Sequence, residues 1–337
     1  MKAALLSESY RIDIVDVDKP KIGDTEVLIR VKSNGICGSD VHAYRGHHAF
    51  RKPPVILGHE VCGVVEELGK AVDAVEIGDR VAVEPQEGCG KCQHCLAGRQ
   101  NICVSRAAPG IGDWKGSFAE YFAAPASKVY RLPEEMSFDT GALMEPLAVG
   151  VHAVRRAGVG LEDSVAILGV GTIGLMNLVA VREAGASGIY ASDLLDFNLG
   201  KARDLGADVA INPGKDDLLE IMRKQEPYGV DKVIITAAFP SAWEQAVRIC
   251  RSGGTVCVVG MFGEPVSVDF LKLLLQEKSI CLSWLYGRED FLTAIEIARS
   301  VDLEPVITHR LPLEEAARGL RMMDERKEDI VKIILNS

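Results

Sequence analysis

The sequence predicts an α/β protein of two domains, one rich in β-strands and one built on a doubly wound parallel sheet. The chain has 337 residues, which exceeds the usual size of a single hydrophobic core. Its first third contains short strand-like runs separated by turns, whereas beyond about residue 145 short apolar runs alternate with helical segments. Such alternation indicates βαβ units and a parallel sheet covered on both faces.

The β-rich part comes first. Val27–Lys32 alternates between apolar and polar residues, and Val61–Val65 and Arg80–Val83 read as further short strands. Turn sequences at Ile22–Asp24 and Ile77–Asp79 separate these strands. No helical periodicity dominates before about residue 140, so we expect this part to be largely β.

Apolar runs beyond residue 145 are expected to form the parallel sheet: Val165–Leu168, Ile189–Ser192, Val209–Ile211, Lys232–Ile235, Thr255–Val259 and Ile280–Trp284. Helical segments lie between most of them, among them Leu218–Lys224, Ala242–Ile249 and Phe270–Glu277. Six strands match a complete dinucleotide-binding Rossmann sheet. Four later segments fall outside that count and are expected to return to the first domain: Phe291–Ser300, Val306–His309, Leu313–Asp324 and Ile330–Leu335.

Charge and composition exclude several classes of partner. The net charge is −10, with acidic and basic residues interleaved, which disfavours nucleic acid and anionic membranes as principal partners. The apolar stretch within Met1–Tyr10 is too short for a secretory signal. Ser164–Val181 is uncharged, but its glycines divide it into a strand and a helix rather than a membrane span. We therefore expect a cytoplasmic location.

A glycine-rich turn marks a nucleotide site. Gly169-Val170-Gly171-Thr172-Ile173-Gly174 fits G-x-G-x-x-G between an expected strand and an expected helix, the context that distinguishes the fingerprint from chance. The first glycine permits a tight turn, the second lets the backbone approach a pyrophosphate at the helix N-terminus, and the third allows close helix–strand packing. A glycine-rich turn without a ligand is the alternative.

The identity of the cofactor follows from the next strand. Asp193 ends that strand, 19 residues after Gly174, where an acidic side chain binds the ribose 2′-hydroxyl. A carboxylate would repel a 2′-phosphate, and no basic residue follows until Lys201. The sequence therefore predicts NAD rather than NADP. Further candidates for contact with the cofactor are Asn198, Gly260 and Met261.

Four of the nine cysteines form one cluster: Cys89, Cys92, Cys95 and Cys103. An odd total without a secretory signal favours reduced thiols and metal binding over disulfides. The spacing is typical of a tetrahedral all-cysteine zinc site, which has no open position and is therefore structural. Free thiols, a nucleic-acid zinc ribbon and an iron–sulfur cluster are the alternatives.

A second metal site is assembled from separated residues. Cys37 lies in Gly-Ile-Cys-Gly-Ser-Asp, His59 in Gly-His-Glu and Glu145 in Met-Glu-Pro. One cysteine, one histidine and one carboxylate leave room for water or substrate, the arrangement of a catalytic zinc. Spacing alone does not establish that these residues meet, and a lone buried cysteine or histidine is more often structural.

A family signature runs through the same residues. Gly58-His59-Glu60-x2-Gly63-x5-Gly69-x2-Val72 resembles the signature of zinc-containing medium-chain dehydrogenases. With Cys37, the cysteine cluster and the glycine fingerprint, this resemblance covers essentially the whole chain. Cys37–His42 and Glu145–His152 are most similar to the sorbitol (polyol) dehydrogenase branch, whereas Tyr286–Glu289 resembles threonine dehydrogenase.

The resemblance implies an architecture. It implies a GroES-like β-rich catalytic domain at 1–146, with a structural zinc loop at 88–104. A Rossmann NAD-binding domain follows at 147–285, and residues 286–337 return to complete the catalytic domain. One catalytic and one structural zinc per chain and a homotetramer are also implied.

It also implies a reaction: hydride passes from a secondary hydroxyl of a small polyol or sugar-derived substrate to NAD. In relatives the proton leaves through the hydroxyl at the position of Ser39, the cofactor ribose and the histidine at the position of His42. A histidine suits that task because its unperturbed pKa lies near neutrality, although a surface histidine without such a role is the alternative. We expect Cys37 and His59 to be fixed ligands, with Glu60 and Glu145 competing for the remaining position.

Departures from each branch leave the substrate open. Ala43 and Leu285 replace an aromatic residue and an arginine that contact the polyol in sorbitol dehydrogenases, and Ala148–Gly150 lacks an asparagine usual in threonine dehydrogenases. Arg45–His48 resembles a stretch in relatives that act on sugar acids, although a solvated loop is its simpler interpretation. L-Threonine and sugar acids (aldonates) are therefore alternative substrates. A zinc- and NAD-binding protein without catalysis is the non-enzyme alternative.

Overall fold

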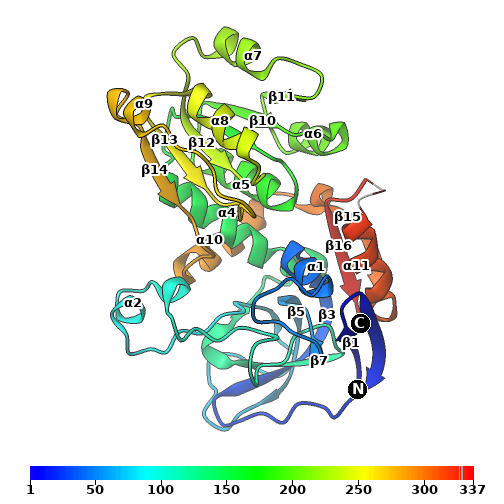
Figure 1. The fold of residues 1–337 in the computed structure, drawn as a ribbon. Helices are drawn as coiled ribbons and strands as arrows, with labels where there is room; N and C mark the ends of the chain where they lie inside the picture. Colours follow the sequence, from blue (N-terminus) through cyan, green and yellow to red (C-terminus); the bar gives the residue numbers. More distant parts are fainter. Residues whose placement is uncertain (326, 328) are drawn as a thin grey trace. The chain divides into compact units, whose positions relative to one another are not determined.

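The computed structural model describes residues 1–325, 327 and 329–337, and these form two compact units (Figure 1). The first unit comprises Met1–Glu145 and Ala294–Ser337, and the second comprises Pro146–Thr293. Two helices contain the junctions, α4 (Met144–Ala157) and α10 (Arg288–Ser300). No helix among the described residues is long and apolar enough to cross a membrane.

A mixed seven-stranded sheet forms the frame of the first unit. Its main order is β15 (Ile307–Pro312), β16 (Lys332–Asn336), β3 (Glu26–Gly35), β5 (Glu60–Leu68), β6 (Arg80–Val83) and β8 (Val129–Arg131), and β7 (Tyr121–Pro125) also pairs with β3. The last strand of the chain, β16, runs antiparallel to β3, with Ile334 opposite Gly35. This pairing places the C-terminal strand next to the segment that leads to Cys37.

A smaller sheet and short helices complete this unit. The sheet has the order β2 (Arg11–Asp16), β1 (Lys2–Glu8) and β4 (Val55–Ile56). The helices are α1 (Gly38–Tyr44), α2 (Gln93–Leu96), α3 (Phe138–Ala142) and α11 (Ala316–Glu325), with 3-10 turns at Gln100–Ile102, Ala126–Lys128, Glu304–Val306 and Leu313–Glu315. The helices before residue 140 were not expected from the sequence, because one or two turns are too short to show a helical period.

The second unit is a six-stranded sheet in which every adjacent pair is parallel. Its order is β11 (Val209–Ile211), β10 (Gly188–Ser192), β9 (Ser164–Leu168), β12 (Val230–Ile235), β13 (Cys250–Val258) and β14 (Ser279–Leu282). Its further helices are α5 (Thr172–Glu183), α6 (Asp196–Asp204), α7 (Leu218–Gln225), α8 (Pro240–Ile249) and α9 (Phe270–Leu275). This topology confirms the predicted doubly wound fold.

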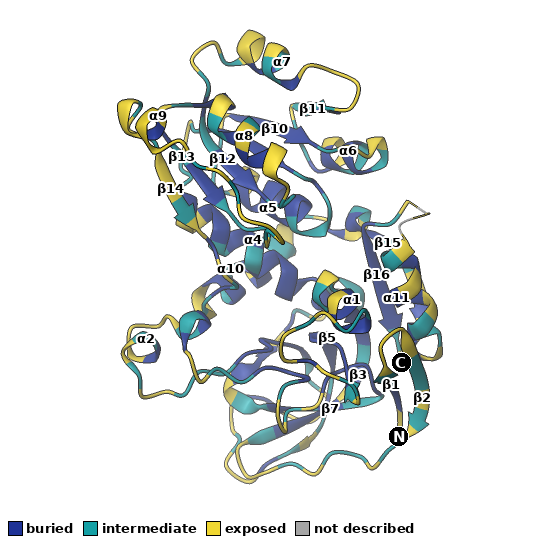
Figure 2. Ribbon diagram, viewed as in Figure 1, coloured by how far each residue is buried: buried dark blue, intermediate teal, exposed yellow. Residues whose placement is uncertain are grey.

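The position of a ligand crevice follows from the strand order. The first strand, β9, lies between β10 and β12, so the chain reverses its direction of winding there. All five residues of β9 are buried, and Figure 2 shows the central strands buried beneath helices with exposed outer faces. In such sheets ligands bind outside the carboxyl ends of the strands at this switch point, where Gly169 begins its turn.

Candidate active site, metal and cofactor sites

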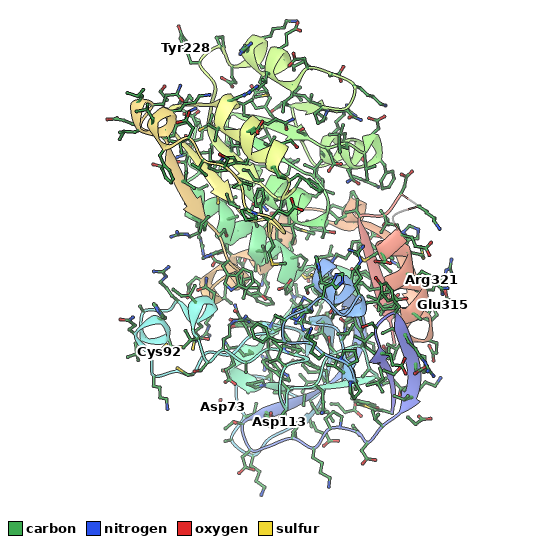
Figure 3. All side chains as sticks on the ribbon, viewed as in Figure 1. Asp73, Cys92, Asp113, Tyr228, Glu315 and Arg321 are labelled. Atoms are coloured by element: carbon green, nitrogen blue, oxygen red, sulfur yellow. The ribbon has the colours of Figure 1, made fainter. Side chains whose placement is uncertain are left out.

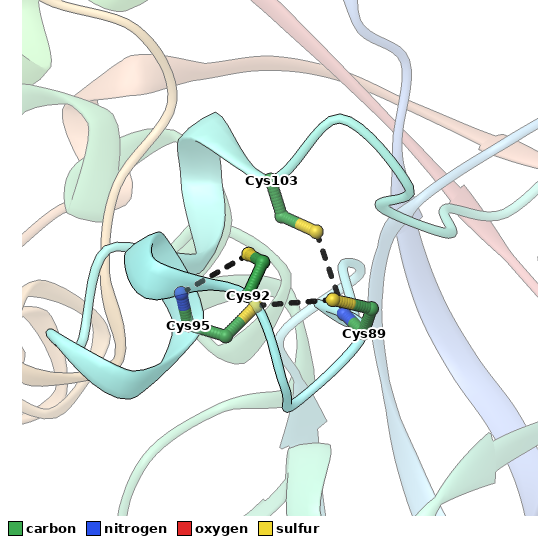
Figure 4. Close-up of side chains that lie close together, drawn as sticks. All are labelled: Cys89, Cys92, Cys95 and Cys103. Carbon is green, nitrogen blue, oxygen red and sulfur yellow. Dashed lines mark hydrogen bonds between the residues drawn. The ribbon is translucent and has the colours of Figure 1, made fainter.

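The cysteine cluster is a closed set of four sulfur donors (Figure 4). The sulfur atoms of Cys89, Cys92, Cys95 and Cys103 all lie within 4.8 Å of one another. Cys92 precedes α2 on the loop that carries the cluster (Figure 3), and its sulfur accepts from the backbone N–H of Cys95 at 3.5 Å. Backbone N–H groups of Lys91 and Cys92 lower the pKa of Cys89 to about 6. This donor set fits a tetrahedral zinc ion with no open position.

Three residues of the first unit converge on a second candidate metal site. A sulfur of Cys37, a ring nitrogen of His59 and a carboxylate oxygen of Glu60 lie within 4.8 Å of one another. Neighbouring residues of an extended strand face opposite sides, but His59 precedes β5 and follows Gly58, whose φ is +90°. The turn at Gly58 therefore lets both side chains face one point. A Cβ at Gly58 would lie 2.3 Å from Phe118, so glycine is required.

Asp40 is the buried carboxylate next to His59. It is fully inaccessible, and its Oδ1 lies 3.5 Å from His59 Nδ1. Oδ2 accepts from the backbone N–H of Cys37 at 3.0 Å, and Oδ1 from that of Gly58 at 3.3 Å. Burial opposes ionisation, but His59, the charge of Arg51 and the backbone N–H of Cys37 lower the pKa of Asp40 to about 2. A carboxylate beside one ring nitrogen orients the imidazole so that its other nitrogen faces a metal.

Glu60 is paired with a lysine from the last strand. Lys332 Nζ donates to both carboxylate oxygens of Glu60, at 2.7 and 2.8 Å, and to the backbone oxygen of Ile36 at 3.0 Å. The side chains of this pair are 2% and 1% exposed. Burial disfavours the charged ammonium, but Glu60 raises the pKa of Lys332 above its usual value. The carboxylate is therefore both within reach of the candidate metal site and held by a cation.

Glu145 lies outside this group. It is buried in the first turn of α4, but it does not belong to the set of donor atoms within 4.8 Å of one another. The structure thus brings Cys37, His59 and Glu60 together, whereas Glu145 is not in that set, although its charge contributes to the raised pKa of Lys332.

Helix α1 carries the two residues expected to move a proton. Ser39 and His42 are three residues apart, which places them on one face of the helix. Ser39 is half-buried and its Oγ accepts from Arg51 Nη1 at 3.1 Å, whereas His42 is exposed. Arg45, in the stretch that resembles sugar-acid relatives, is paired with Asp324. Arg45 is therefore committed to a contact within its own unit.

The glycine loop is closely packed at its first and third glycines and open at its second. Gly169 has φ +92°, and a Cβ there would lie 2.5 Å from that of Ala237. A Cβ at Gly174 would lie 1.9 Å from the Gly169 carbonyl oxygen, so the helix packs closely on the turn. Gly171 has open space around it and caps α5 without a side-chain hydrogen bond. Thr172 and Ile173 begin the helix, whose N-terminus thus remains open to a phosphate.

The other cofactor candidates lie in the same unit. Asp193 follows β10, and its carboxylate accepts from the N–H groups of Val170 at 2.8 Å and Leu195 at 2.9 Å. Asn198 on α6 is buried, and its Oδ1 has no partner among the described residues. Gly260 and the exposed Met261 follow β13. Asp193, Gly260 and Gly169 therefore lie just beyond strands whose carboxyl ends share one edge of the sheet.

Sequence reasoning missed three residues of the first unit. Asp40 had a signal, because it lies inside the Cys37 motif and a metal-bound histidine usually has a carboxylate neighbour. Lys332 also had one, as the single charged residue in the final apolar run Ile330–Leu335. Arg51 lies on an irregular segment with no pattern that distinguishes it from the exposed Lys52.

Comparison with known proteins places the whole chain in one family. The model of the alcohol dehydrogenase GroES-like domain matches residues 23–134, and that of zinc-binding dehydrogenases matches residues 172–300. An L-threonine 3-dehydrogenase of Bacillus velezensis is 36% identical over 345 residues, covering 99% of this chain and 98% of the relative. An L-idonate 5-dehydrogenase of Vitis vinifera is 36% identical over 306 residues, covering 88% of this chain and 83% of that relative.

Solved structures are similar along the full length. A structure from Escherichia coli, an oxidoreductase of unknown specificity, has a TM-score of 0.95 at 33% identity, covering 99% of this chain and 98% of that one. A zinc-binding dehydrogenase structure from Sinorhizobium meliloti, bound to NADP, has a TM-score of 0.93 at 32% identity, covering 100% and 99%.

Fold, donor sets and relatives define an oxidoreductase that acts on a small molecule with zinc and a nicotinamide cofactor. The chain belongs to the zinc-containing medium-chain alcohol dehydrogenase family, in its threonine and polyol dehydrogenase branch. The family and fold predicted from the sequence are thereby confirmed.

The Glu60–Lys332 pair generates a prediction about stability. Lys332→Met leaves the carboxylate of Glu60 buried without its cation, so we expect the free energy of unfolding to fall by about 3–5 kcal/mol. Urea denaturation measures this loss. Glu60→Gln in the same background should recover part of it, because no buried charge is then left without a partner.

Lys224→Met is the matched control, because the Lys224–Glu220 pair lies on the surface of α7, with side chains 69% and 63% exposed. We expect it to change the free energy of unfolding by less than about 1 kcal/mol. Equal stabilities of the Lys332 and Lys224 variants would contradict the role of the buried pair.

Proposed function

We propose that this protein is a zinc-dependent, NAD-linked dehydrogenase that oxidises a secondary hydroxyl of a small polyol or sugar-derived substrate to a carbonyl. The observation that carries the proposal is the convergence of Cys37, His59 and Glu60 within 4.8 Å. Three protein donors leave a fourth position for a substrate oxygen. We propose that the first unit, expected from the sequence at 1–146 and 286–337, is the catalytic domain and that the second, expected at 147–285, binds NAD; the structure divides the units after Glu145 and after Thr293.

Each residue in and around the group of Cys37, His59 and Glu60 has a distinct task. Cys37 and His59 hold the catalytic ion, and Glu60 or Glu145 completes its protein ligands. The ion, when bound, acts as a Lewis acid on the substrate hydroxyl, while bound NAD takes up the hydride. Ser39 Oγ receives the substrate proton, and the exposed His42, on the same face of α1, passes a proton to solvent. The four cysteines of the other site hold a structural ion.

Asp193 selects NAD. We propose that its carboxylate receives the ribose 2′-hydroxyl, as expected for an acid at the end of the second strand of such a sheet. Its two hydrogen bonds, from Val170 and Leu195, hold it beside the glycine loop.

A second candidate is oxidation of L-threonine or of a sugar acid. The observation that favours it is the similarity to an L-threonine 3-dehydrogenase and an L-idonate 5-dehydrogenase, each 36% identical. Both substrates carry a carboxylate next to their hydroxyl groups, unlike a neutral polyol.

We also propose a homotetramer in the cytoplasm. Self-association is supported by the edge strand β14 and by helix α9, whose exposed apolar residues are Phe270, Leu271, Leu274, Leu275, Ile280 and Leu282. An edge strand with unpaired backbone groups beside exposed apolar side chains is a surface that proteins usually cover.

The substrate is tested with the wild-type enzyme. NADH formation is measured against polyols, aldonates, L-threonine and simple secondary alcohols, with NAD and with NADP. We expect the highest kcat/KM with a polyol, because an open metal position accepts a hydroxyl oxygen, and with NAD, because Asp193 is expected to bind the ribose 2′-hydroxyl. Preference for threonine or an aldonate supports the second candidate instead. No activity despite bound zinc and NAD points to a non-catalytic binding protein.

The variant Cys89→Ser distinguishes the proposed structural zinc ion from the proposed catalytic one. This variant removes a donor from the closed site only, so the zinc content should fall by about one ion per chain and the other ion should remain. Metal analysis by mass spectrometry gives the count. Cys281→Ser, which lies outside both donor groups, serves as the control and should keep both ions. Loss of both ions in Cys89→Ser would contradict two independent sites.

Cofactor choice is tested with Asp193→Ala. We expect kcat/KM for NAD to fall by about 10- to 100-fold, since a hydrogen bond to a charged group contributes about 1.5–3 kcal/mol. The same change should raise the relative rate with NADP, because a repelling charge is removed. Asp204→Ala on the exposed face of α6 is the control. An unchanged ratio of NAD to NADP would remove Asp193 from the cofactor site.

A further inference from the structure

Arg51 is a buried cation near the group of Cys37, His59 and Glu60. The chemistry proposed above gives it no role. The residue is 6% exposed, although it lies on the irregular segment between α1 and β4. Its Nε donates to the backbone oxygen of Pro109 at 3.0 Å. Burial of a guanidinium is unfavourable unless its charge and its N–H groups find partners, so the identity of those partners indicates what it does.

The backbone that leads into Arg51 is held in place by His48. The Nδ1 atom of His48 accepts from the N–H groups of Phe50 at 3.2 Å and Arg51 at 2.9 Å. A ring nitrogen that accepts carries no proton, and burial, together with the charge of Arg51, lowers the pKa of His48 to about 4. The turn is thus intact at neutral pH. Gly110 leaves room for the side chain, since a Cβ there would lie 3.3 Å from Arg51 Cδ.

The guanidinium faces two groups of the site. Nη1 donates to Ser39 Oγ at 3.1 Å and lies 3.9 Å from Asp40 Oδ1. That carboxylate oxygen is in turn 3.5 Å from His59 Nδ1. Arg51 therefore contacts the hydroxyl assigned to receive the substrate proton and approaches the carboxylate that orients the histidine.

The contact fixes the direction of the serine hydroxyl. A guanidinium has only donors, whereas a hydroxyl has one donor and two acceptor positions. Ser39 Oγ must therefore accept from Arg51, and its own O–H must point away from it. One lone pair remains to accept a proton from a substrate hydroxyl. Without Arg51 nothing in this contact prevents the hydroxyl from rotating.

We propose that Arg51 is a positioning residue for proton transfer, which holds the Ser39 hydroxyl with a free lone pair toward the substrate and its O–H directed onward. The proposal rests on the proposed function. In the step, the substrate O–H bond breaks and its proton bonds to Ser39 Oγ, while the original Ser39 proton leaves toward His42. Arg51 keeps all its protons, and the hydride would leave the substrate carbon with its electron pair for bound NAD as the carbonyl forms.

A double-mutant cycle tests this on the zinc-loaded enzyme. Arg51→Met should lower kcat by about 10- to 100-fold, less than the roughly 10²- to 10⁴-fold contribution of a proton-transfer group itself, with KM and zinc content changed less than about twofold. In the Ser39→Ala background the same change should lower kcat by less than about threefold, because the hydroxyl that Arg51 orients is gone. Arg51→Lys, which keeps a charged donor, should restore part of kcat.

Lys52→Met is the matched control, because Lys52 is the adjacent, exposed cation and should leave kcat unchanged. Equal losses of kcat from Arg51→Met in the two backgrounds would overturn the proposal, since Arg51 would then act independently of Ser39. A change confined to KM of carboxylate-bearing substrates would also overturn it and indicate a substrate-binding arginine.

A second cycle needs no activity. Urea unfolding is measured for the wild type, Arg51→Met, Ser39→Ala and the variant that combines both changes. The two changes should show a coupling of about 3- to 10-fold in the unfolding equilibrium constant. Additive effects would overturn the contact between Arg51 and Ser39. If the wild type oxidises no alcohol of the panel, the proposed function is wrong. A coupling measured in this cycle would still support the positioning of Ser39 by Arg51.

Discussion

The first unit is organised by the need to neutralise buried charge. Asp40 and Glu60 are almost inaccessible, and each lies beside a candidate metal ligand or is itself one. An isolated buried carboxylate is strongly disfavoured, so each requires a cation or N–H donors from elsewhere in the chain. Lys332, from the last strand, serves Glu60, while Arg51 and His59 lie near Asp40. Distant segments are thus tied to the ends of β3 and β5 by electrostatics as well as by the sheet.

In the second unit the corresponding constraint is space for the backbone rather than charge. A side chain at Gly169 would collide with Ala237, just beyond β12, and one at Gly174 would collide with the carbonyl oxygen of Gly169, whereas Gly171 faces open space. These three glycines therefore let β9 and α5 pack closely and leave the N-terminus of α5 accessible. Asp193 contributes to both features, because it accepts a hydrogen bond from Val170 inside the turn.

Much of the fold was predictable because its signals are local. The strands of the parallel sheet are short apolar runs between glycine turns, and the glycine fingerprint and the cysteine cluster each lie within one short segment. Residues that act through long-range pairing gave weaker signals. Lys332 reads as part of an apolar strand until it is paired with Glu60, 272 residues away. Helix α1, which carries Ser39 and His42, is too short to show a helical period in the sequence. Arg51 is identified as a residue of the site only by its contact with Ser39 in the structure.

The difference between the two metal sites follows from what surrounds their donors. The four sulfurs lie within 4.8 Å of one another, and those of Cys92 and Cys103 accept from backbone N–H groups, so an ion there would be saturated and fixed. At the other site Lys332 already holds both oxygens of Glu60, and an ion must compete with that ammonium for the carboxylate. If Glu60 rather than Glu145 completes the protein ligands, as proposed above, this competition would weaken its bond to the ion. A weakly held carboxylate would suit an ion that exchanges water for substrate at each turnover, which makes Lys332 relevant to the proposed chemistry.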